Sequence, residues 1–489
     1  MAYTILDCYT DEPAGLGVPP YLGTYPRYIF GKLLLEDEKV NYITIDDLRY
    51  YNSGFKKDES AKKKSLKTNI RIYNLTKTDE EIKKIIQNTS VLIVILGVHT
   101  PGKYLSAIPG TLHEVLPLIE RINCKKVLTG PAVYGTQLEG GKFFERADLS
   151  AFDKIENPDL SYGEIKEYAV KGAEILNLIN DLRVIEIETS RGCQRKKGCS
   201  FCLEPIKHKL EFREKKDIVD EANSLYSMGA RHFRLGKQSC IYSYPELVEL
   251  LREIRASCKE LKVLHIDNAN PINVLNDQNN EKTKAIVRYS TEGNIAAFGI
   301  ESFDKAVYEE NNLNCTAEQA IEAVRIINKY GAKRGENGMP IFLPGINLIF
   351  GLKAETKKTH EENIKWLKKI LEESLLIRRI NIRQASIFEG TELLSSAGNK
   401  FIRKNKRYYW KWRNEIRQSI DYEMLKRLLP VGSILKDVRM EIYEGSTTFG
   451  RQVGTYPLII GVKERLELKK FYNVEIASHM LRSATAKVI

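Results

Sequence analysis

A chain of 489 residues predicts two to four domains at roughly 100–200 residues each, which excludes a lone small binding module. Hydrophobic residues make up 43% and charged residues 29%, a composition that excludes an intrinsically disordered protein. The formal net charge is +12, and most of this excess lies at the end of the chain. Residues 401–420 hold seven Lys or Arg against one Glu, and residues 421–489 hold eleven against eight Asp or Glu, so the last 89 residues carry +9. A basic end with interleaved aromatics is typical of a nucleic-acid binder, and the alternative is a solvated basic face.

The first residues, MAYTILDCYTDEP, lack the basic and apolar regions of a signal peptide. The longest apolar run, at 91–98, has the length of a buried strand and falls short of the roughly 20 residues that span a bilayer. We therefore expect a soluble, cytoplasmic protein with reduced cysteines. In such a protein, clustered cysteines among the eight become candidate metal ligands.

Residues 1–150 predict a doubly wound, Rossmann-like α/β domain, because amphipathic helical stretches separate several predicted parallel strands. The strands are expected at 3–9, 41–48, 70–75, 91–98 and 125–130. Such sheets bind ligands at the carboxyl ends of their strands, and plain turn chemistry is the alternative for the loops found there. These Gly- and Pro-rich loops are at 11–26, 99–110 and 129–135. The charged segment 56–65 predicts a surface loop.

A second series of alternating strands and helices occupies residues 180–400 and predicts a complete or partial TIM-type (βα)6 barrel. Its six strands lie in RVIEIETSRGC, HFRLGKQS, KVLHIDNA, IAAFGIES, GINLIFGL and INIRQASI. A basic aromatic helix is expected over 401–428. Short β-rich pieces then fill residues 430–489 and predict a small β-barrel.

Three cysteines lie close together just after the first predicted strand of the barrel series. Cys193, Cys199 and Cys202 are spaced C-x5-C-x2-C within ETSRGCQRKKGCSFCLEP. Three thiolates on one short loop suit three irons of a [4Fe-4S] cluster, leaving the fourth iron open. A structural zinc site would normally supply a fourth ligand, and a loop of plain reduced cysteines is the remaining alternative.

This segment resembles radical SAM enzymes, in which a three-cysteine loop follows the first strand of a (βα)6 barrel and an aromatic residue, here Phe201, precedes the last cysteine. The resemblance implies a [4Fe-4S] cluster on these cysteines and S-adenosylmethionine on the open iron. It also implies cleavage of the sulfonium by one electron to give a 5′-deoxyadenosyl radical. Most members space the loop C-x3-C-x2-C, so the x5 gap departs from the usual pattern.

Later segments resemble the family in order and imply further contacts with S-adenosylmethionine. FRLGKQS matches the second-strand motif, which assigns Gly236 and Gln238 to the cofactor. AAFGIESFD matches the fourth strand and assigns Glu301 with Ser302. GINLIFGLKAET resembles the fifth-strand segment, and Arg383 in INIRQASIFEGT resembles the sixth.

The last 60 residues resemble TRAM domains, small β-barrels that follow the radical SAM barrel in tRNA methylthiotransferases and bind RNA. The match is clearest at TFGR, which ends with Arg451. Together with the basic helix, this resemblance assigns RNA phosphates to seven cations. They are Arg403, Lys404, Lys406, Arg407, Lys411, Arg413 and Arg451. Tyr408, Tyr409, Trp410 and Trp412 are candidates for stacking on bases, and we expect about half of them to be core because Tyr409 and Trp412 share a helix face.

The N-terminal domain resembles both methylthiotransferase and cobalamin-binding domains. The former carries three cysteines for a second cluster, whereas this one has only Cys8 and Cys124, far apart in sequence. The latter resemblance admits cobalamin as a further cofactor, although the D-x-H-x-x-G sequence is missing and His99, in a loop at the expected edge, is more often a plain hydrogen bonder. The whole arrangement resembles a group of archaeal radical SAM iron–sulfur proteins.

We therefore predict a radical SAM enzyme that modifies a nucleoside in tRNA or other RNA, by methylthiolation, methylation or a similar transfer, with ferredoxin or flavodoxin as electron donor. One alternative is a cobalamin-dependent radical SAM methyltransferase acting on a protein or small molecule. An alternative of another class is an RNA-binding scaffold with a structural cluster.

Overall fold

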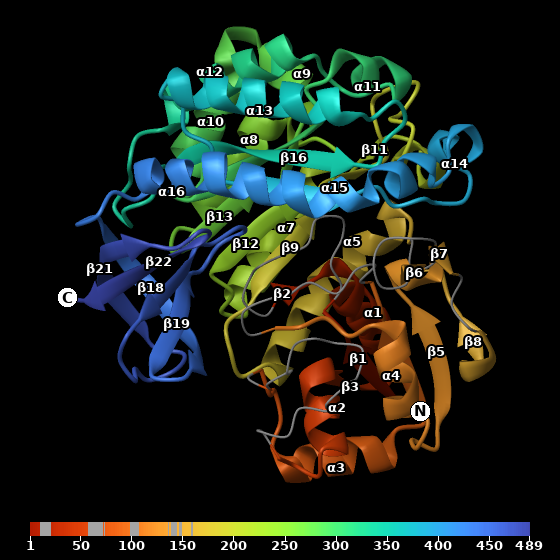
Figure 1. The fold of residues 1–489 in the computed structure, drawn as a ribbon. Helices are drawn as coiled ribbons and strands as arrows, with labels where there is room; N and C mark the ends of the chain where they lie inside the picture. Colours follow the sequence, from red (N-terminus) through yellow and green to blue (C-terminus); the bar gives the residue numbers. More distant parts are fainter. Residues whose placement is uncertain are drawn as a thin grey trace.

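The computed structural model describes residues 1–9, 21–56, 72, 74–97, 107–134, 136–137, 144–145, 149–157 and 160–489. Figure 1 shows three packed parts: an N-terminal sheet with helices, an open barrel of parallel strands and a small C-terminal β-barrel. Within the described ranges, no helix is long and apolar enough to cross a bilayer. The predicted loops at 11–26, 56–65 and 99–110, together with His99, lie wholly or mostly outside these ranges.

The N-terminal part is a five-stranded parallel sheet in the order β3-β1-β4-β5-β8. Its strands are β1 (Ala2–Asp7), β3 (Lys39–Thr44), β4 (Val91–Ile95), β5 (Lys125–Thr129) and β8 (Lys154–Ile155). Its helices are α1 (Thr24–Leu35), α2 (Ile45–Asn52), α3 (Asp79–Asn88) and α4 (Leu112–Ile119), followed by α5 (Tyr162–Lys171) on the way to the barrel. Four of the five predicted strands are confirmed. The described residues of the fifth, at 70–75, lie in no strand.

The predicted strand over 41–48 ends early because Thr44 starts a helix. The Thr44 hydroxyl accepts a hydrogen bond from the Asp47 backbone, and the Asp47 carboxylate accepts one from the Thr44 backbone. This capping box satisfies two backbone N–H groups at the start of α2, so the chain turns into a helix where the apolar pattern alone suggested a longer strand.

The central barrel contains all six predicted strands. They are β9 (Val184–Glu188), β12 (His232–Gly236), β13 (Val263–Ile266) continued by β14 (Asn268–Ala269), β15 (Asn294–Glu301), β16 (Phe342–Phe350) and β17 (Ile380–Gln384). The helices outside them are α7 (Lys215–Ser227), α8 (Leu247–Ser257), α9 (Pro271–Leu275), α10 (Glu281–Tyr289), α11 (Lys305–Glu310), α12 (Ala317–Gly331) and α13 (Lys357–Glu372). Strand β2 (Tyr21–Leu22) adds to the free edge of β9 in parallel, and among the described strands β2 and β17 do not pair, so the barrel is partial.

The N-terminal sheet is buried on both faces, as parallel sheets usually are. On β1, Ile5 joins a large core that continues through α1 into the barrel, while Leu6 points into a separate core between the sheet and its other helices. Arg27 on α1 ion-pairs with Glu221 on α7, which also pairs with Arg213, and all three side chains are buried. The N-terminal part is therefore fastened to the barrel by both apolar packing and a buried ion network.

The C-terminal part is a closed five-stranded barrel in the order β18-β19-β20-β22-β21, which confirms the predicted small β-barrel. Its strands are β18 (Ile434–Glu444), β19 (Thr447–Gln452), β20 (Ile459–Val462), β21 (Phe471–His479) and β22 (Ser483–Val488). Three helices precede it: α14 (Glu392–Ser396), α15 (Lys400–Ile416) and α16 (Tyr422–Leu428), with one π-helical turn over 417–421 between the last two.

This small barrel docks against the amino ends of the central strands. Arg439 on β18 forms an ion pair with Asp181, three residues before β9. Its Nη2 lies 2.7 and 2.8 Å from the two carboxylate oxygens. Gln452 donates a hydrogen bond of 2.8 Å to the carbonyl of Asn337, in the loop before β16. Met339 in that same loop packs into the core of the small barrel.

A loop between β19 and β20 enters the central barrel from this side. The backbone N–H of Thr455 donates to Nδ1 of His265, and Nε2 of that ring faces the Glu292 carbonyl at 3.2 Å. Burial lowers the pKa of His265 to about 4, so the ring is neutral and carries its proton on Nε2. Tyr456 is buried and donates to Asp267 at 2.9 Å inside the barrel. The amino end of the barrel is therefore filled by the C-terminal part.

Candidate functional site

The three clustered cysteines lie on a loop that leaves the carboxyl end of β9. Two short antiparallel strands, β10 (Ser190–Arg191) and β11 (Glu211–Phe212), join the two ends of this loop. At Gly192 the backbone has φ +75°, and a Cβ there would lie 2.4 Å from the Lys209 carbonyl oxygen, so the position requires glycine. Helix α6 (Glu204–Lys207) follows Cys202. The loop thus projects all three thiols from one edge of the barrel.

Cys199 and Cys202 are sheltered, and burial raises the pKa of each thiol to about 12. The charges of neighbouring cysteines contribute to this increase in pKa, and Cys193 contributes to both, so the three sulfur atoms lie within electrostatic reach of one another. Among the described residues, no three His, Cys, Asp or Glu side chains converge as the ligands of a single ion do. That is compatible with a cluster, because each cysteine then binds a different iron.

The longer gap between the first two cysteines is anchored to the segment after α11. Arg195 donates from Nη1 to Sγ of Cys199 at 3.1 Å and from Nη2 to the carbonyl of Leu313 at 3.0 Å. Asn312 donates to the carbonyls of Lys197 and Gly198 at 2.8 and 2.9 Å. The extra residues therefore have a fixed conformation, and one of them places a cation on a ligand sulfur.

Glu301 ends β15 next to this loop. Its φ is +66°, which is uncommon for a residue with a side chain, and the strand register shifts between Gly299 and Glu301. The side chain is buried, and Oε2 accepts no hydrogen bond. Burial raises the pKa of this carboxyl to about 8, while the charge of Arg383 on β17 lowers it. The negative charge of Glu301 also raises the pKa of Cys199, so the Glu301 carboxyl lies close to the predicted cluster site.

The buried Oε2 of Glu301 fits the ammonium group of S-adenosylmethionine, because a buried carboxylate oxygen without a donor favours a cationic partner. The neighbouring Ser302 is also buried, but its hydroxyl accepts from the Asp304 backbone at 3.2 Å and so has a local role. Gln238 is buried, donates to the Leu235 carbonyl and keeps its Oε1 without a partner.

Gly236, which its motif assigns to the cofactor, lies against a carboxylate inside the barrel. A Cβ at this position would lie 2.2 Å from Oε1 of Glu186, so the glycine makes room for that carboxylate inside the barrel. Glu186 is buried, and burial raises its pKa to about 7. Arg234 on the next strand ion-pairs with Asp267, lies 3.7 Å from Glu186 and leaves Nε and Nη1 without a partner.

These interior charges were missed by the sequence reasoning, although a signal was present. In β9, Glu186 and Glu188 alternate with Ile185 and Ile187, so both carboxylates face the interior while the isoleucines face the helices. Although burial opposes it, the charges of Lys237 and neighbouring arginines lower the pKa of Glu188 to about 2. The barrel interior is thus charged rather than filled by branched aliphatic side chains.

A second cluster does not form between Cys8 and Cys124. Cys8 follows the carboxyl end of β1 and is fully buried, and Cys124 precedes the amino end of β5. Five residues of strand at about 3.3 Å each separate these two edges of the sheet by roughly 16 Å. The two thiols therefore cannot share one cofactor.

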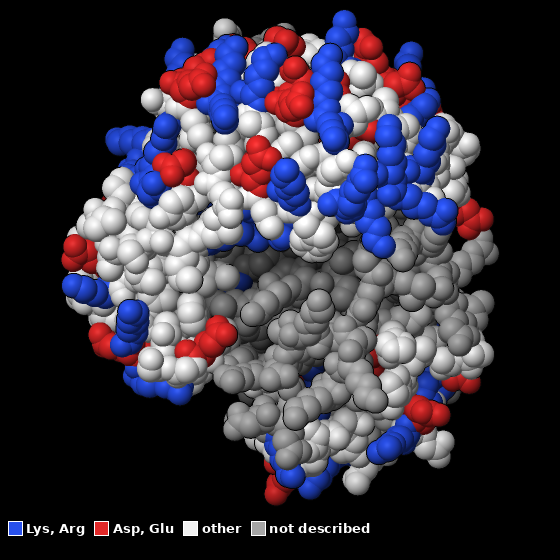
Figure 2. Space-filling view, in the orientation of Figure 1, with Lys and Arg blue, Asp and Glu red and all other residues white. Residues whose placement is uncertain are grey.

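Helix α15 presents a cationic surface beside the cysteine loop. Five of the predicted RNA contacts on it are exposed: Arg403, Lys404, Lys406, Arg407 and Lys411. Arg413 is half-buried, with its guanidinium over the Trp410 ring, which is 62% exposed. Figure 2 shows Lys and Arg gathered where Figure 1 places the α14 end of α15.

The aromatic residues of α15 divide as expected between surface and core. Trp412 is 5% exposed and stacks against Phe350, His360 and Tyr408 at 5.3 to 5.8 Å. Tyr409 lies on the same face of α15 as Trp412 and packs edge-on against the Phe350 ring. Trp410 is therefore the tryptophan of this helix that solvent reaches.

Arg451 does not belong to the cationic surface, so that prediction is wrong. It is 1% exposed and pairs through Nε and Nη2 with both carboxylate oxygens of Glu441, at 3.0 and 2.9 Å. The pair joins neighbouring strands β18 and β19. A guanidinium held in this way is structural and is not accessible to a phosphate.

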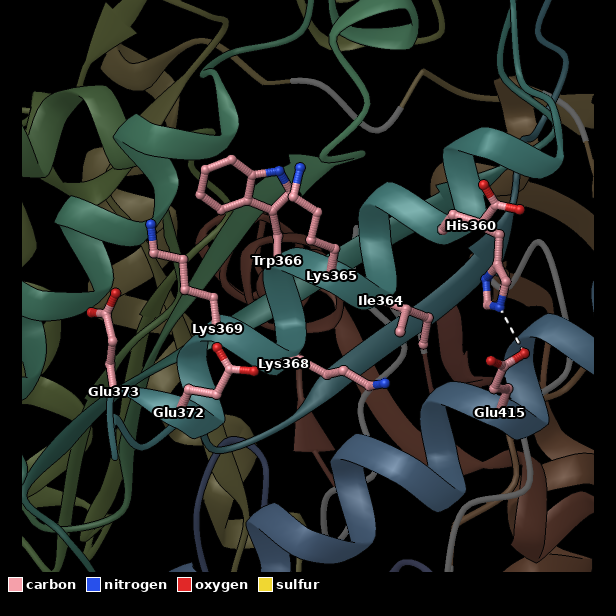
Figure 3. Close-up of a pocket in the computed structure, with 10 residues that line it drawn as sticks. His360, Ile364, Lys365, Trp366, Lys368, Lys369, Glu372, Glu373 and Glu415 are labelled. Atoms are coloured by element: carbon pink, nitrogen blue, oxygen red, sulfur yellow. Dashed lines mark hydrogen bonds and ion pairs between the residues drawn. The ribbon is translucent and has the colours of Figure 1, made fainter.

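A groove of about 680 Å³ runs between α13 and α15 on the outside of the molecule (Figure 3). Its walls mix three lysines with four glutamates, and His360 bonds to Glu415 at 2.9 Å. None of its lining residues belongs to the cysteine loop or to the barrel interior. Because its charges nearly cancel, the groove does not extend the cationic surface of α15.

Comparison with known proteins gives the family. Residues 187–375 match the model of the Radical SAM superfamily. A Methanocaldococcus jannaschii protein, "Uncharacterized protein MJ0274", is 40% identical over 99% of this chain and 93% of its own length. An Archaeoglobus fulgidus protein, "Uncharacterized protein", is 36% identical over 99% and 90%.

Two solved structures are more distant. The radical S-adenosylmethionine methyltransferase TsrM of Kitasatospora setae is 13% identical, with 78% of this chain and 72% of that chain covered and a TM-score of 0.46. The cobalamin-dependent S-adenosylmethionine radical enzyme OxsB is 14% identical, with 86% and 58% covered and a TM-score of 0.46. A radical SAM domain implies a [4Fe-4S] cluster and S-adenosylmethionine, for which the cysteine loop and Glu301 supply suitable groups. Residues 187–375 therefore form a domain of the Radical SAM superfamily, and the chain belongs to one family with both relatives over nearly its whole length.

Proposed function

We propose that this radical SAM enzyme modifies a nucleoside in RNA, with tRNA as the expected substrate, and that α15 binds the RNA. The observation that carries the proposal is the surface of this helix, which has no acidic residue from Lys400 to Asn414 and exposes five cations. Lysine and arginine bind backbone phosphates, and an exposed tryptophan such as Trp410 stacks on an unpaired base. The exposed groups of α15 thus suit a single-stranded or looped RNA.

The position of α15 supports the same reading. Ile402 packs in one apolar cluster with Cys199 and Phe201 of the cysteine loop. Asn405 donates to the carboxylate of Glu355, in the loop that follows the carboxyl end of β16. RNA bound along the exposed face of α15 would therefore lie beside the edge of the barrel that carries the thiols.

In this proposal Cys193, Cys199 and Cys202 hold the cluster, and Glu301 orients S-adenosylmethionine through its ammonium group. When bound, these cofactors supply a 5′-deoxyadenosyl radical. The target base must leave its stack to reach the barrel, so a loop nucleotide is the expected target. Inside the barrel, Nε and Nη1 of Arg234 have no hydrogen-bond partner and can donate to the edge of a base. Oε1 of Glu186 can accept a hydrogen bond from the same edge.

Two measurements test the proposal. Removing Lys404 and Arg407 by alanine substitution should weaken tRNA binding and reduce the slope of log K against log salt by about 0.7 to 0.9 for each lost phosphate contact. The matched control removes two exposed cations from α3, Lys83→Ala and Lys84→Ala, and should leave the slope unchanged. An unchanged affinity in the α15 variant would refute its role. Mass spectrometry of tRNA nucleosides from a deletion strain and its parent should reveal one missing modification.

A second candidate function is cobalamin-dependent methyl transfer to a protein or small molecule. The observation that favours it is the strand order of the N-terminal sheet, because in this order the connections reverse between β1 and β4. Open α/β sheets bind their ligands at such a switch point, at the carboxyl ends of the strands. Corrinoid absorbance in protein purified after reconstitution with cobalamin would support this candidate, and its absence would refute it. An RNA-binding scaffold with a structural cluster would instead release no 5′-deoxyadenosine from S-adenosylmethionine under reducing conditions.

A further inference from the structure

The outer surface of the cysteine loop combines exposed aliphatic side chains with cations. Ile206 on α6 is 53% exposed and Leu210 is 39% exposed, both unusual for large apolar residues. Lys196, Lys197 and Lys209 are exposed around them. We call these five residues the loop face.

The loop face is continuous because the two halves of the loop pack on each other. A Cβ at Gly198 would lie 2.4 Å from Pro205, which places the segment before Cys199 against α6. Lys197 pairs with Glu392 at 3.2 Å, and the nearest side chain to Gly390 is that of Ile206. Lys197 and Ile206 therefore meet at the same turn before α14.

The charge of the loop face is positive. Residues 194–210 contain five Lys or Arg and one glutamate. That glutamate, Glu204, is turned inward and accepts the backbone N–H of Gly192 at 2.8 Å. Of the exposed lysines, Lys197 is balanced by Glu392, whereas Lys196 and Lys209 lie outside every ion pair recorded for the described residues.

The loop face also lies close to the predicted cluster along the chain. Lys196 and Lys197 stand between the first two ligands, and Ile206 follows the third by four residues. An electron that enters at this surface has a short path along the chain to the cluster, because the ligands belong to the same loop. The reaction of the family needs one electron for each cleavage of S-adenosylmethionine.

We propose that the loop face is the docking site of a small acidic protein that delivers this electron from a reduced flavin or iron–sulfur centre. One electron passes to the cluster, so the donor is oxidised by one electron, the cluster is reduced by one, and no bond or proton is exchanged. Electron carriers form small, transient interfaces, for which a few apolar contacts within a cationic rim suffice, and the opposite charges accelerate the encounter. RNA fits this surface less well than α15, because its exposed apolar residues are aliphatic and offer bases no ring to stack on.

The proposal rests on membership of the radical SAM superfamily and is independent of whether the substrate is RNA. The test uses the cluster-loaded full chain and an acidic flavodoxin in its fully reduced form as the probe. Stopped-flow bleaching of the cluster absorbance gives the second-order rate constant of reduction. In Lys196→Glu/Lys209→Glu this constant should fall by about tenfold or more at low salt, and the difference from the wild type should shrink as salt rises.

Dithionite needs no protein docking and its reducing species carries a single negative charge, so its rate should fall far less in the variant than the rate with flavodoxin. A matched charge reversal far from the loop, Lys83→Glu/Lys84→Glu on α3, should keep the wild-type rate with flavodoxin. Ile206→Ser tests the apolar part without changing charge and should weaken flavodoxin binding, measured by calorimetry with oxidised flavodoxin and protein that carries no cluster. Wild-type reduction rates in the charge variant, or unchanged binding in Ile206→Ser, would overturn the proposal, as would a loss of tRNA binding in the charge variant without a change in reduction.

Discussion

The substitution Glu301→Gln separates the charge of this carboxylate from its shape. The side chain is buried, its Oε2 lacks a donor, and it lies beside the cysteine loop, so we expect it to accept a hydrogen bond from the ammonium group of S-adenosylmethionine. A hydrogen bond to a charged partner contributes about 1.5–3 kcal/mol. At a pH where Glu301 is charged, loss of this charge should therefore weaken S-adenosylmethionine binding by roughly 10- to 160-fold.

The same carboxylate predicts how binding depends on pH. Burial raises the pKa of Glu301 to about 8, so at pH 7 about one molecule in ten carries the charged form that accepts the ammonium. The affinity should rise by at least about fivefold between pH 7 and pH 8 and should continue to rise above pH 8, while Glu301→Gln should be flat over this range. A bound cluster with its three thiolates is negatively charged and moves the pKa in the same direction as burial.

Calorimetric titration of the cluster-loaded protein with S-adenosylmethionine, without reductant, measures both effects. The control Glu309→Gln removes an exposed carboxylate on α11 and should bind as the wild type does, and the iron content of each variant must match the wild type. If Glu301→Gln binds within twofold of the wild type, or if its pH dependence is unchanged, the assignment of Glu301 to the cofactor is wrong.

Three other substitutions test the core and the cluster loop. Arg451→Ala removes the guanidinium that pairs with the buried Glu441 and should destabilise the C-terminal barrel by about 3–5 kcal/mol, measured by hydrogen exchange of its strands, whereas Arg451→Met with Glu441→Leu should restore much of that stability. Arg195→Gln removes a cation from a ligand sulfur and should make the cluster midpoint potential more negative in a redox titration followed by EPR, with iron content unchanged. Trp412→Ala should cost about 3–5 kcal/mol in thermal unfolding, whereas Trp410→Ala should leave stability intact and weaken RNA binding by about 1–3 kcal/mol.

Local patterns allowed the sequence to predict the elements and the cluster loop. Apolar and polar side chains alternate along a strand because successive side chains point to opposite faces of the sheet. The spacing of Cys193, Cys199 and Cys202 likewise involves only residues close together in the chain. The same alternation in β9 already marks Glu186 and Glu188 as interior residues, so the charged barrel interior could have been predicted from the sequence.

Partnerships between distant segments were not predictable in this way. Arginine is a residue type that often binds phosphate, which is why Arg451 looked like an RNA contact. Only the register of β18 against β19 shows that Glu441 neutralises its charge. Likewise, nothing near Tyr456 in the sequence indicates that it bonds to Asp267, which lies 189 residues earlier. Such contacts depend on how three parts of the chain pack, and a residue's own sequence neighbourhood carries no record of that packing.

The contact of Tyr456 with Asp267 shows how the amino end of the barrel is closed. The loop that carries Tyr456 fills the barrel from the amino ends of its strands, and Arg379 covers the tyrosine ring at 4.4 Å. The thiols, Glu301 and the cationic face of α15 all lie at the opposite, carboxyl edge. We therefore expect a substrate to approach the reacting groups from that edge, and Asp267, which bonds to Tyr456, also pairs with Arg234 in the barrel interior. The C-terminal barrel thus supports the interior of the radical SAM barrel directly, in addition to any contact it makes with RNA.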